Sequence, residues 1–148
     1  MPNLILLPGP PTKIFDRLLL GTLWDAKQLD EYEHSVGLVV NCTDETIHRS
    51  RYLDTIQLGI IDGQPVPLAK VGLAIHSLHK FFMLTHKRSV LVCCHASVSR
   101  SPAIVLAYLM SIGLSFDEAM STLRVSHSKT NIAPAILKSV RRYFGIEQ

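Results

Sequence analysis

The stretch "VLVCCHASVSRSPAIVLAYLM", from Val90 to Met110, decides the fold. The apolar run SVLVCC predicts a buried strand, and SPAIVLAYLMSIG predicts a helix with Pro102 in its first turn and Gly113 as its end. Small and polar residues join the two segments. A loop between a buried strand and a helix start favours anions, because backbone N–H groups and the positive end of the helix dipole both face it.

Apolar runs and helical patterns alternate along the rest of the chain. Strands are predicted in KIFDRLLLGT, as one element ending at Gly21, in GLVVNC and in LDTIQLGIID, which ends at Asp62. Helices are predicted in WDAKQLDEYEH, from Leu68 to Leu84, in SFDEAMSTLRV and from Pro134 to Phe144. This alternation predicts an α/β fold: a mostly parallel twisted sheet of about four to five strands, with helices on both faces.

Composition is ordinary for a single domain spanning residues 1–148, with 47% apolar residues. No apolar run is long enough for a membrane span, and a net charge of +3 does not indicate nucleic-acid binding. Cys42, Cys93 and Cys94 do not suggest a disulfide framework. We therefore expect reduced thiols in the cytoplasm or nucleus, and neither a membrane nor a nucleic-acid partner. No pattern in the sequence sets an oligomeric state.

Cys94 and Arg100 enclose five residues in the predicted loop. We expect the loop backbone to curl around a phosphate, with the guanidinium of Arg100 holding two of its oxygens. The positive potential would favour the thiolate of Cys94, an activated nucleophile. The loop residues predicted to bind substrate are His95, Ala96, Ser97, Val98, Ser99 and Arg100.

A phosphate ester also needs a general acid for its leaving oxygen. Asp62 fits this role, because in parallel sheets the loops after neighbouring strands meet at one edge. The hydroxyl of Ser101 would assist when sulfur leaves in the second step. The predicted catalytic residues are therefore Cys94, Arg100, Asp62 and Ser101, with no metal and no cofactor.

The segment from Val90 to Met110 resembles the signature of cysteine-dependent dual-specificity protein phosphatases, His-Cys-x-x-Gly-x-x-Arg-Ser/Thr followed by proline and a helix. The resemblance covers about Ile14 to Phe144 and implies a compact member with little beyond the catalytic core. It implies hydrolysis of phosphotyrosine and of phosphoserine or phosphothreonine in proteins, through a cysteinyl-phosphate. A phosphoinositide or an RNA 5′-phosphate would use the same chemistry.

Two positions inside the signature depart from the family. Cys93 replaces the histidine that orients the nucleophile, and Ser97 replaces the glycine of the loop. If Ser97 adopts a positive φ, we expect strain that Ser97→Gly would relieve. The alternative is that its hydroxyl bonds to the thiolate or the phosphate. These departures motivate a second hypothesis, a phosphate-binding module with little turnover. A third, sulfur transfer, is disfavoured by Asp62.

Other polar residues have simpler interpretations. Cys93 should point away from Cys94 and pack in the core. His76, His79 and His86 are expected to be solvated or packed rather than to bind metal. Arg49 and Arg51 are exposed candidates for guiding a phosphorylated partner.

Overall fold

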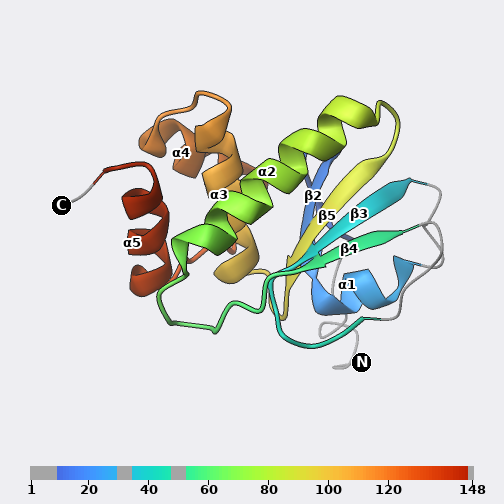
Figure 1. Ribbon diagram of the computed structural model, residues 1–148, viewed down its shortest axis with the longest axis horizontal. Helices are drawn as coiled ribbons and strands as arrows, with labels where there is room; N and C mark the ends of the chain where they lie inside the picture. Colours follow the sequence, from blue (N-terminus) through green and yellow to red (C-terminus); the bar gives the residue numbers. More distant parts are fainter. Residues whose placement is uncertain (1–9, 30–34, 48–52, 147–148) are drawn as a thin grey trace.

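The computed structural model describes residues 10–29, 35–47 and 53–146. Within these residues, five strands form one sheet in the order β1-β2-β5-β3-β4 (Figure 1). The edge strand β1 is antiparallel to β2, and the other neighbours are parallel. The mostly parallel sheet predicted from the sequence is therefore confirmed. Its strands are β1 (Thr12–Phe15), β2 (Leu18–Thr22), β3 (Val36–Asn41), β4 (Asp54–Gln57) and β5 (Ser89–Cys94).

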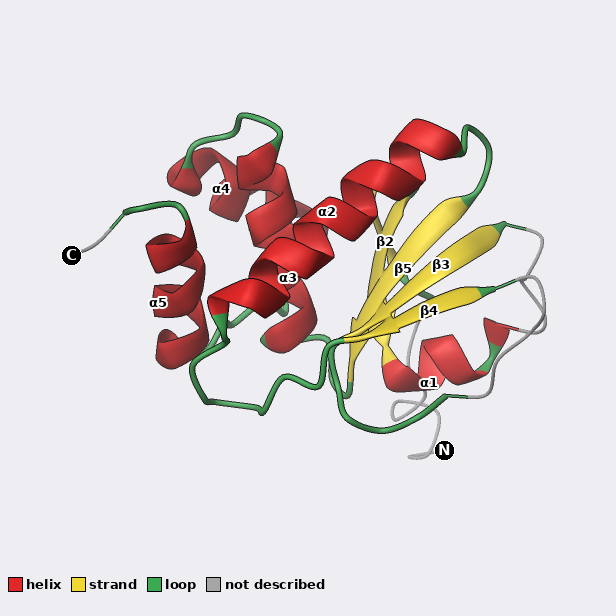
Figure 2. Cartoon of the chain, in the orientation of Figure 1, coloured by secondary structure: helices red, strands yellow, loops and turns green. Residues whose placement is uncertain are grey.

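Helices cover both faces of the sheet, as Figure 2 shows. One face carries α1 (Leu23–Lys27), and the other carries α2 (Leu68–Leu84), α3 (Arg100–Ser111), α4 (Phe116–Ser126) and α5 (Pro134–Tyr143). Alternate side chains of β5 reach opposite cores, because successive residues of a strand face opposite sides. Leu91 and Cys93 pack on the α1 side, whereas Val92 and Cys94 pack on the α2–α5 side.

The helix α3 lies at the centre of the larger core. Every residue from Arg100 to Met110 is buried, and α3 packs against α2, α4, α5 and β5. Its apolar content on all sides suits this position, since a helix hydrophobic all round must be covered all round. Gly113 follows it with φ +111°, a conformation that favours glycine at a helix end. The start of α3, at Arg100, is thereby fixed against the end of β5.

The segment KIFDRLLLGT differs from its prediction. It forms two strands, β1 and β2, joined at Asp16 and Arg17, rather than one element. Arg17 accounts for the turn, because its guanidinium donates to the carbonyl oxygens of Thr85 and Arg88 just beyond the end of α2. These long-range hydrogen bonds hold the turn between the two apolar runs.

The strand before Asp62 is shorter than predicted. β4 ends at Gln57, and the chain then leaves the sheet through Gly59, whose φ is +59°. Backbone hydrogen bonds from Leu58 to Asn41 and from Ile60 to Cys42 guide this segment along the end of β3. Asp62 consequently lies in an extended loop beyond the sheet edge rather than at the end of a strand.

Two helix predictions were also tested by the structure. α1 ends at Lys27, so the longer helix predicted in WDAKQLDEYEH is wrong in length, although Ala26 and Leu29 are buried as expected. Tyr32, the third predicted residue of that face, lies outside the described residues. The capping box of α4 is confirmed: Ser115 and Glu118 exchange side-chain-to-backbone hydrogen bonds.

No helix in the described part of the chain combines the length and the apolar character needed to cross a bilayer.

Burial along α2 generates a first prediction. Leu78 is fully buried and Leu73 is 47% exposed on the same helix. Leu78→Ala should lower the free energy of unfolding by about 2–5 kcal/mol, because it removes buried methyl groups and leaves a cavity. Leu73→Ala is the matched control and should change it by less than about 1 kcal/mol. Chemical denaturation measures both, and equal losses would contradict the placement of α2.

Candidate active site

The β5–α3 loop, residues Cys94–Arg100, begins at a buried sulfur atom. Cys94 is 2% exposed at the end of β5. Its Sγ lies 3.1 Å from Oγ of Ser101 and 3.3 Å from the backbone nitrogen of Ser101, which donates to it. Ser101 is in the first turn of α3, so the helix dipole also points its positive end at the sulfur. The sulfur of Cys94 therefore faces a backbone N–H group and the start of a helix.

Arg100 joins the β5–α3 loop to the loop that carries Asp62. Its Nη1 donates to the carbonyl oxygen of Ile60 at 3.1 Å, and its Nε lies 3.8 Å from Oδ1 of Asp62. The side chain of Arg100 is 10% exposed, whereas that of Asp62 is 69% exposed. The two loops that the sequence predicted to meet are thus in contact, with a solvent-exposed acid beside a buried guanidinium.

Ser97 adopts the left-handed conformation that its place in the signature suggested. Its φ is +58°, and it is the one residue other than glycine with positive φ among those described. The side chain is fully buried, with Oγ 3.3 Å from Oγ of Ser101 and 3.2 Å from Nε2 of His127. The positive φ is therefore confirmed, and the hydroxyl contacts Ser101 and His127 rather than the sulfur of Cys94.

The α4–α5 loop, residues 127–133, holds the outer side of the β5–α3 loop. Nε2 of His127 lies 2.7 Å from the carbonyl oxygen of Ser97, and the amide of Asn131 donates to the carbonyl of Val98 at 2.8 Å. The amide of Ala133 donates to Oγ of Ser99 at 2.8 Å. These bonds clamp three consecutive loop residues from one side.

The clamp determines where the loop amides point. In a trans peptide the C=O and N–H groups point in opposite directions. Because the carbonyls of Ser97 and Val98 face the α4–α5 loop, the N–H groups of Val98 and Ser99 face away from it. Successive N–H groups on one side form an anion-binding nest. The loop is therefore built to hold an oxyanion.

The other cysteines are poor nucleophiles in this structure. Burial raises the pKa of Cys93 to about 12, with smaller contributions from Cys94 and Asp25. Burial also raises the pKa of Cys42 well above its usual value, assisted by Cys94 and Cys93. Both remain neutral thiols at neutral pH, and all three cysteines are free. The prediction that Cys93 packs in the core, away from Cys94, is confirmed.

The remaining predicted residues differ in exposure. His95 and Ala96 are exposed at the mouth of the loop, while Val98 and Ser99 are half-buried. The described residues contain no group of three side chains able to hold a metal ion. His79 instead packs, with Nε2 2.9 Å from Oγ of Ser111. Arg49 and Arg51 lie outside the described residues.

Sequence reasoning missed His127. Its imidazole is 5% exposed, and it contacts Ser97 on one side and Thr12 of β1 on the other. In the sequence it belongs to a polar stretch between two helices, where a histidine is usually solvated. No spacing relative to Cys94 identifies it, because the packing of several elements determines the contact.

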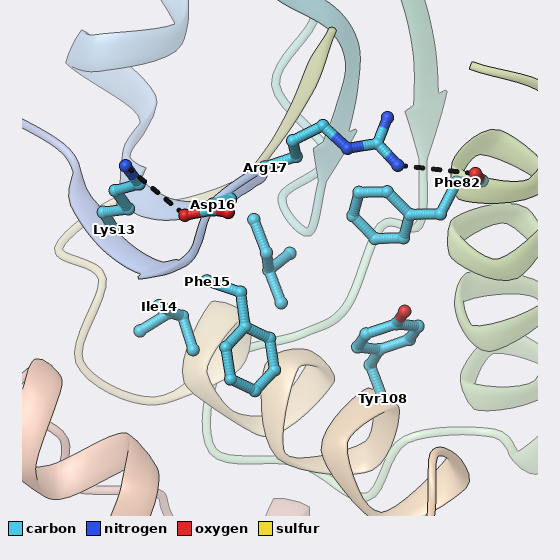
Figure 3. A pocket seen from close by; sticks show the side chains of 8 residues that line it. Lys13, Ile14, Phe15, Asp16, Arg17, Phe82 and Tyr108 are labelled. Atoms are coloured by element: carbon cyan, nitrogen blue, oxygen red, sulfur yellow. Dashed lines mark hydrogen bonds and ion pairs between the residues drawn. The ribbon is translucent and has the colours of Figure 1, made fainter. Parts of the chain in front are cut away.

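A cavity lies apart from these residues, between the β1–β2 turn and the helices α2 and α3 (Figure 3). Its volume is about 710 Å³. The guanidinium of Arg17 lies 5.0 Å from the ring centre of Phe82 and donates to the carbonyl of the same residue at 3.4 Å. These contacts fasten the hairpin to α2, and we assign this cavity a structural origin.

The geometry of the β5–α3 loop is that of a cysteine-based phosphate site on an α/β fold. The family model described as "Dual specificity phosphatase, catalytic domain" matches residues 18–144, which include this loop and the loop of Asp62. The chain therefore belongs to the dual-specificity phosphatase catalytic-domain family.

Known proteins agree with this assignment. Mouse dual specificity protein phosphatase 15 is 24% identical over 135 residues, which cover 89% of this chain and 57% of that protein. Human protein phosphatase Slingshot homolog 2 is 28% identical over 145 residues, covering 92% of this chain and 10% of that protein. The chain thus spans little more than half the length of the first relative and a tenth of the second.

The fold has solved counterparts. The crystal structure of human DUSP28 superposes with a TM-score of 0.81 at 20% identity, covering 93% of this chain and 94% of that one. At this identity the likeness establishes the fold, and the chemistry is argued from the residues above.

The positive φ of Ser97 generates a second prediction. Ser97→Gly and Ser97→Ala both remove the hydroxyl, and they differ in whether a Cβ must adopt a left-handed conformation. The glycine variant should be more stable to chemical denaturation than the alanine variant by about 1 kcal/mol. Equal stability of the two variants would show that the loop relaxes to a negative φ and stores no strain.

Proposed function

We propose that this protein hydrolyses phosphate monoesters on proteins through a phosphorylated Cys94, without a metal. The observation that carries the proposal is the position of Cys94 Sγ. It accepts a hydrogen bond from the backbone nitrogen of Ser101 and lies 3.1 Å from the hydroxyl of Ser101. Arg100 closes the same loop, and Asp62 lies 3.8 Å from its guanidinium. A cysteine sulfur, an anion nest and a carboxyl group thereby lie together.

In the first step, the thiolate of Cys94 attacks phosphorus and a sulfur–phosphorus bond forms. The bond from phosphorus to the ester oxygen breaks, and Asp62 donates a proton to the departing oxygen. Arg100 and the loop amides stabilise the charge on the equatorial oxygens of the transition state. The exposed carboxyl of Asp62 can reach a substrate oxygen, since its loop is anchored through Ile60 to Arg100.

In the second step, water attacks the phosphocysteine. Asp62, now a carboxylate, accepts a proton from the water, the sulfur–phosphorus bond breaks and inorganic phosphate leaves. The sulfur departs as a thiolate, and the hydroxyl and amide of Ser101 stabilise it as the charge returns. The starting form of Cys94 is thereby restored without a redox change.

We propose phosphotyrosine and phosphoserine or phosphothreonine in proteins as the substrates. Membership of the family supports this choice, and the names of the relatives describe them as protein phosphatases. Buried, free thiols suit a reducing compartment, which supports the cytoplasm or the nucleus as the location.

Two observations favour a second candidate, a phosphate-binding module with weak turnover. Cys93 provides no imidazole beside the nucleophile, and Ser97 introduces a Cβ where φ is +58°. Both candidate functions use the same anion nest, and they differ only in the reactivity of the sulfur of Cys94.

Turnover of p-nitrophenyl phosphate separates these candidates. We expect hydrolysis that persists in excess chelator and is abolished in Cys94→Ser, because a hydroxyl is a far weaker nucleophile at neutral pH. Binding of inorganic phosphate or vanadate should survive in this variant. Cys93→Ser is the matched control and should retain turnover. Binding without turnover in the wild-type protein would establish the second candidate. Loss of turnover in Cys93→Ser but not in Cys94→Ser would show that Cys93 is the nucleophile.

The acid role of Asp62 has its own test. Asp62→Asn should reduce kcat by roughly 10²–10⁴-fold for substrates with poor leaving groups, whose oxygen requires a proton. The loss should be much smaller for activated aryl phosphates. Asp54, which is exposed on β4, offers the matched control Asp54→Asn, with activity near that of wild type. A loss independent of the leaving group would assign Asp62 a structural role.

A further inference from the structure

A continuous row of polar atoms leads from the edge strand β1 to the proposed nucleophile. Oγ1 of Thr12 lies 2.6 Å from Nδ1 of His127, and Nε2 of His127 lies 2.7 Å from the carbonyl oxygen and 3.2 Å from Oγ of Ser97. Oγ of Ser97 lies 3.3 Å from Oγ of Ser101, which lies 3.1 Å from Sγ of Cys94. The row connects β1, the α4–α5 loop and the β5–α3 loop.

The direction of these hydrogen bonds follows from their partners. The carbonyl oxygen of Ser97 can only accept, so Nε2 of His127 carries the hydrogen and Nδ1 accepts from the hydroxyl of Thr12. Since Nε2 is then a donor, the hydroxyl of Ser97 cannot donate to it. The hydrogen of Ser97 is left for Oγ of Ser101, and that of Ser101 for the sulfur of Cys94.

We propose that His127 is a positioning residue that orients the hydroxyls of Ser97 and Ser101 so that both donate toward the thiolate of Cys94. This inference rests on the proposed role of Cys94 as the nucleophile. Without the imidazole, the hydroxyl of Ser101 can turn and donate to Ser97 instead, which leaves the sulfur with the amide of Ser101 alone. The chain has Cys93 in place of the family histidine beside the nucleophile. His127, from the α4–α5 loop, thereby supplies an imidazole that acts on the nucleophile through Ser97 and Ser101.

The surroundings of His127 favour its neutral form. Burial lowers the pKa of His127 and Lys129 lowers it further, while the hydrogen bond to Ser97 opposes these effects. The imidazole borders a small cavity that is also lined by Thr12 of β1, Asp25 of α1 and Lys129. In the neutral form one ring nitrogen donates and the other accepts, which is the pattern that the partners on both sides require.

Alkylation of Cys94 by iodoacetamide as a function of pH tests the inference, because it reads the thiolate directly and needs no turnover. His127→Leu should slow alkylation at neutral pH by roughly 3- to 10-fold, as expected for a lost hydrogen bond. The pH of half-maximal alkylation should rise by roughly half a unit to one unit. His127→Gln, whose amide can still donate to Ser97, should restore most of the wild-type rate.

Ser97→Ala provides a second variant that leaves the imidazole and its bond to the Ser97 carbonyl in place. It should shift the midpoint in the same direction, and the double variant with His127→Leu should shift it no further. His79→Leu is the matched control, because it removes a half-buried imidazole that also contacts a serine hydroxyl, on a helix that does not carry the site. Its alkylation profile should match that of wild type.

The outcomes are distinguishable. A fall in melting temperature of His127→Leu with an unchanged midpoint would mean that His127 only supports the fold, and it would overturn the inference. Additive shifts in the double variant would also overturn it, since they would place His127 and Ser97 on separate routes to the sulfur. If Cys94→Ser leaves the fast alkylation intact, the proposed nucleophile itself is wrong.

Discussion

The orientation of two peptide groups, between Ser97 and Val98 and between Val98 and Ser99, is the constraint on which the site depends. An anion nest requires N–H groups on one side. A peptide can point its N–H group inward only if its carbonyl points outward, where the carbonyl oxygen needs a hydrogen-bond donor. Here His127 and the amide of Asn131 bond to those two carbonyls. The helices α4 and α5 that carry this clamp are therefore as important for the site as the strand that carries Cys94.

This constraint also accounts for the backbone strain at Ser97. A residue with a Cβ at φ +58° stores strain of roughly 1–3 kcal/mol. The buried hydroxyl offsets part of this strain through its contacts with Ser101 and His127, at about 1 kcal/mol for a typical hydrogen bond. Serine in place of glycine thus exchanges an unstrained backbone for a polar contact near the sulfur.

Local patterns were sufficient to predict the central sheet, the helices α2 and α3, and the meeting of the Asp62 and Cys94 loops. The sheet and the helices depend on periodicity and on residues that start and end a helix, such as Pro102 and Gly113. The meeting of the loops follows from the parallel arrangement of the strands. The β1–β2 hairpin was missed because its turn depends on Arg17 bonding to the chain just beyond the distant end of α2. His127 was missed for the same reason: its partners lie on other elements, and no local spacing encodes a tertiary contact.

The central claim is that phosphate passes through the sulfur of Cys94. Rapid quenching of Asp62→Asn during turnover of an activated aryl phosphate, followed by peptide mass spectrometry, locates the intermediate directly. The account predicts a phosphorylated peptide with the phosphoryl group on Cys94, and none in Cys94→Ser. A phosphoryl group on Cys93 or Ser101 instead would contradict it.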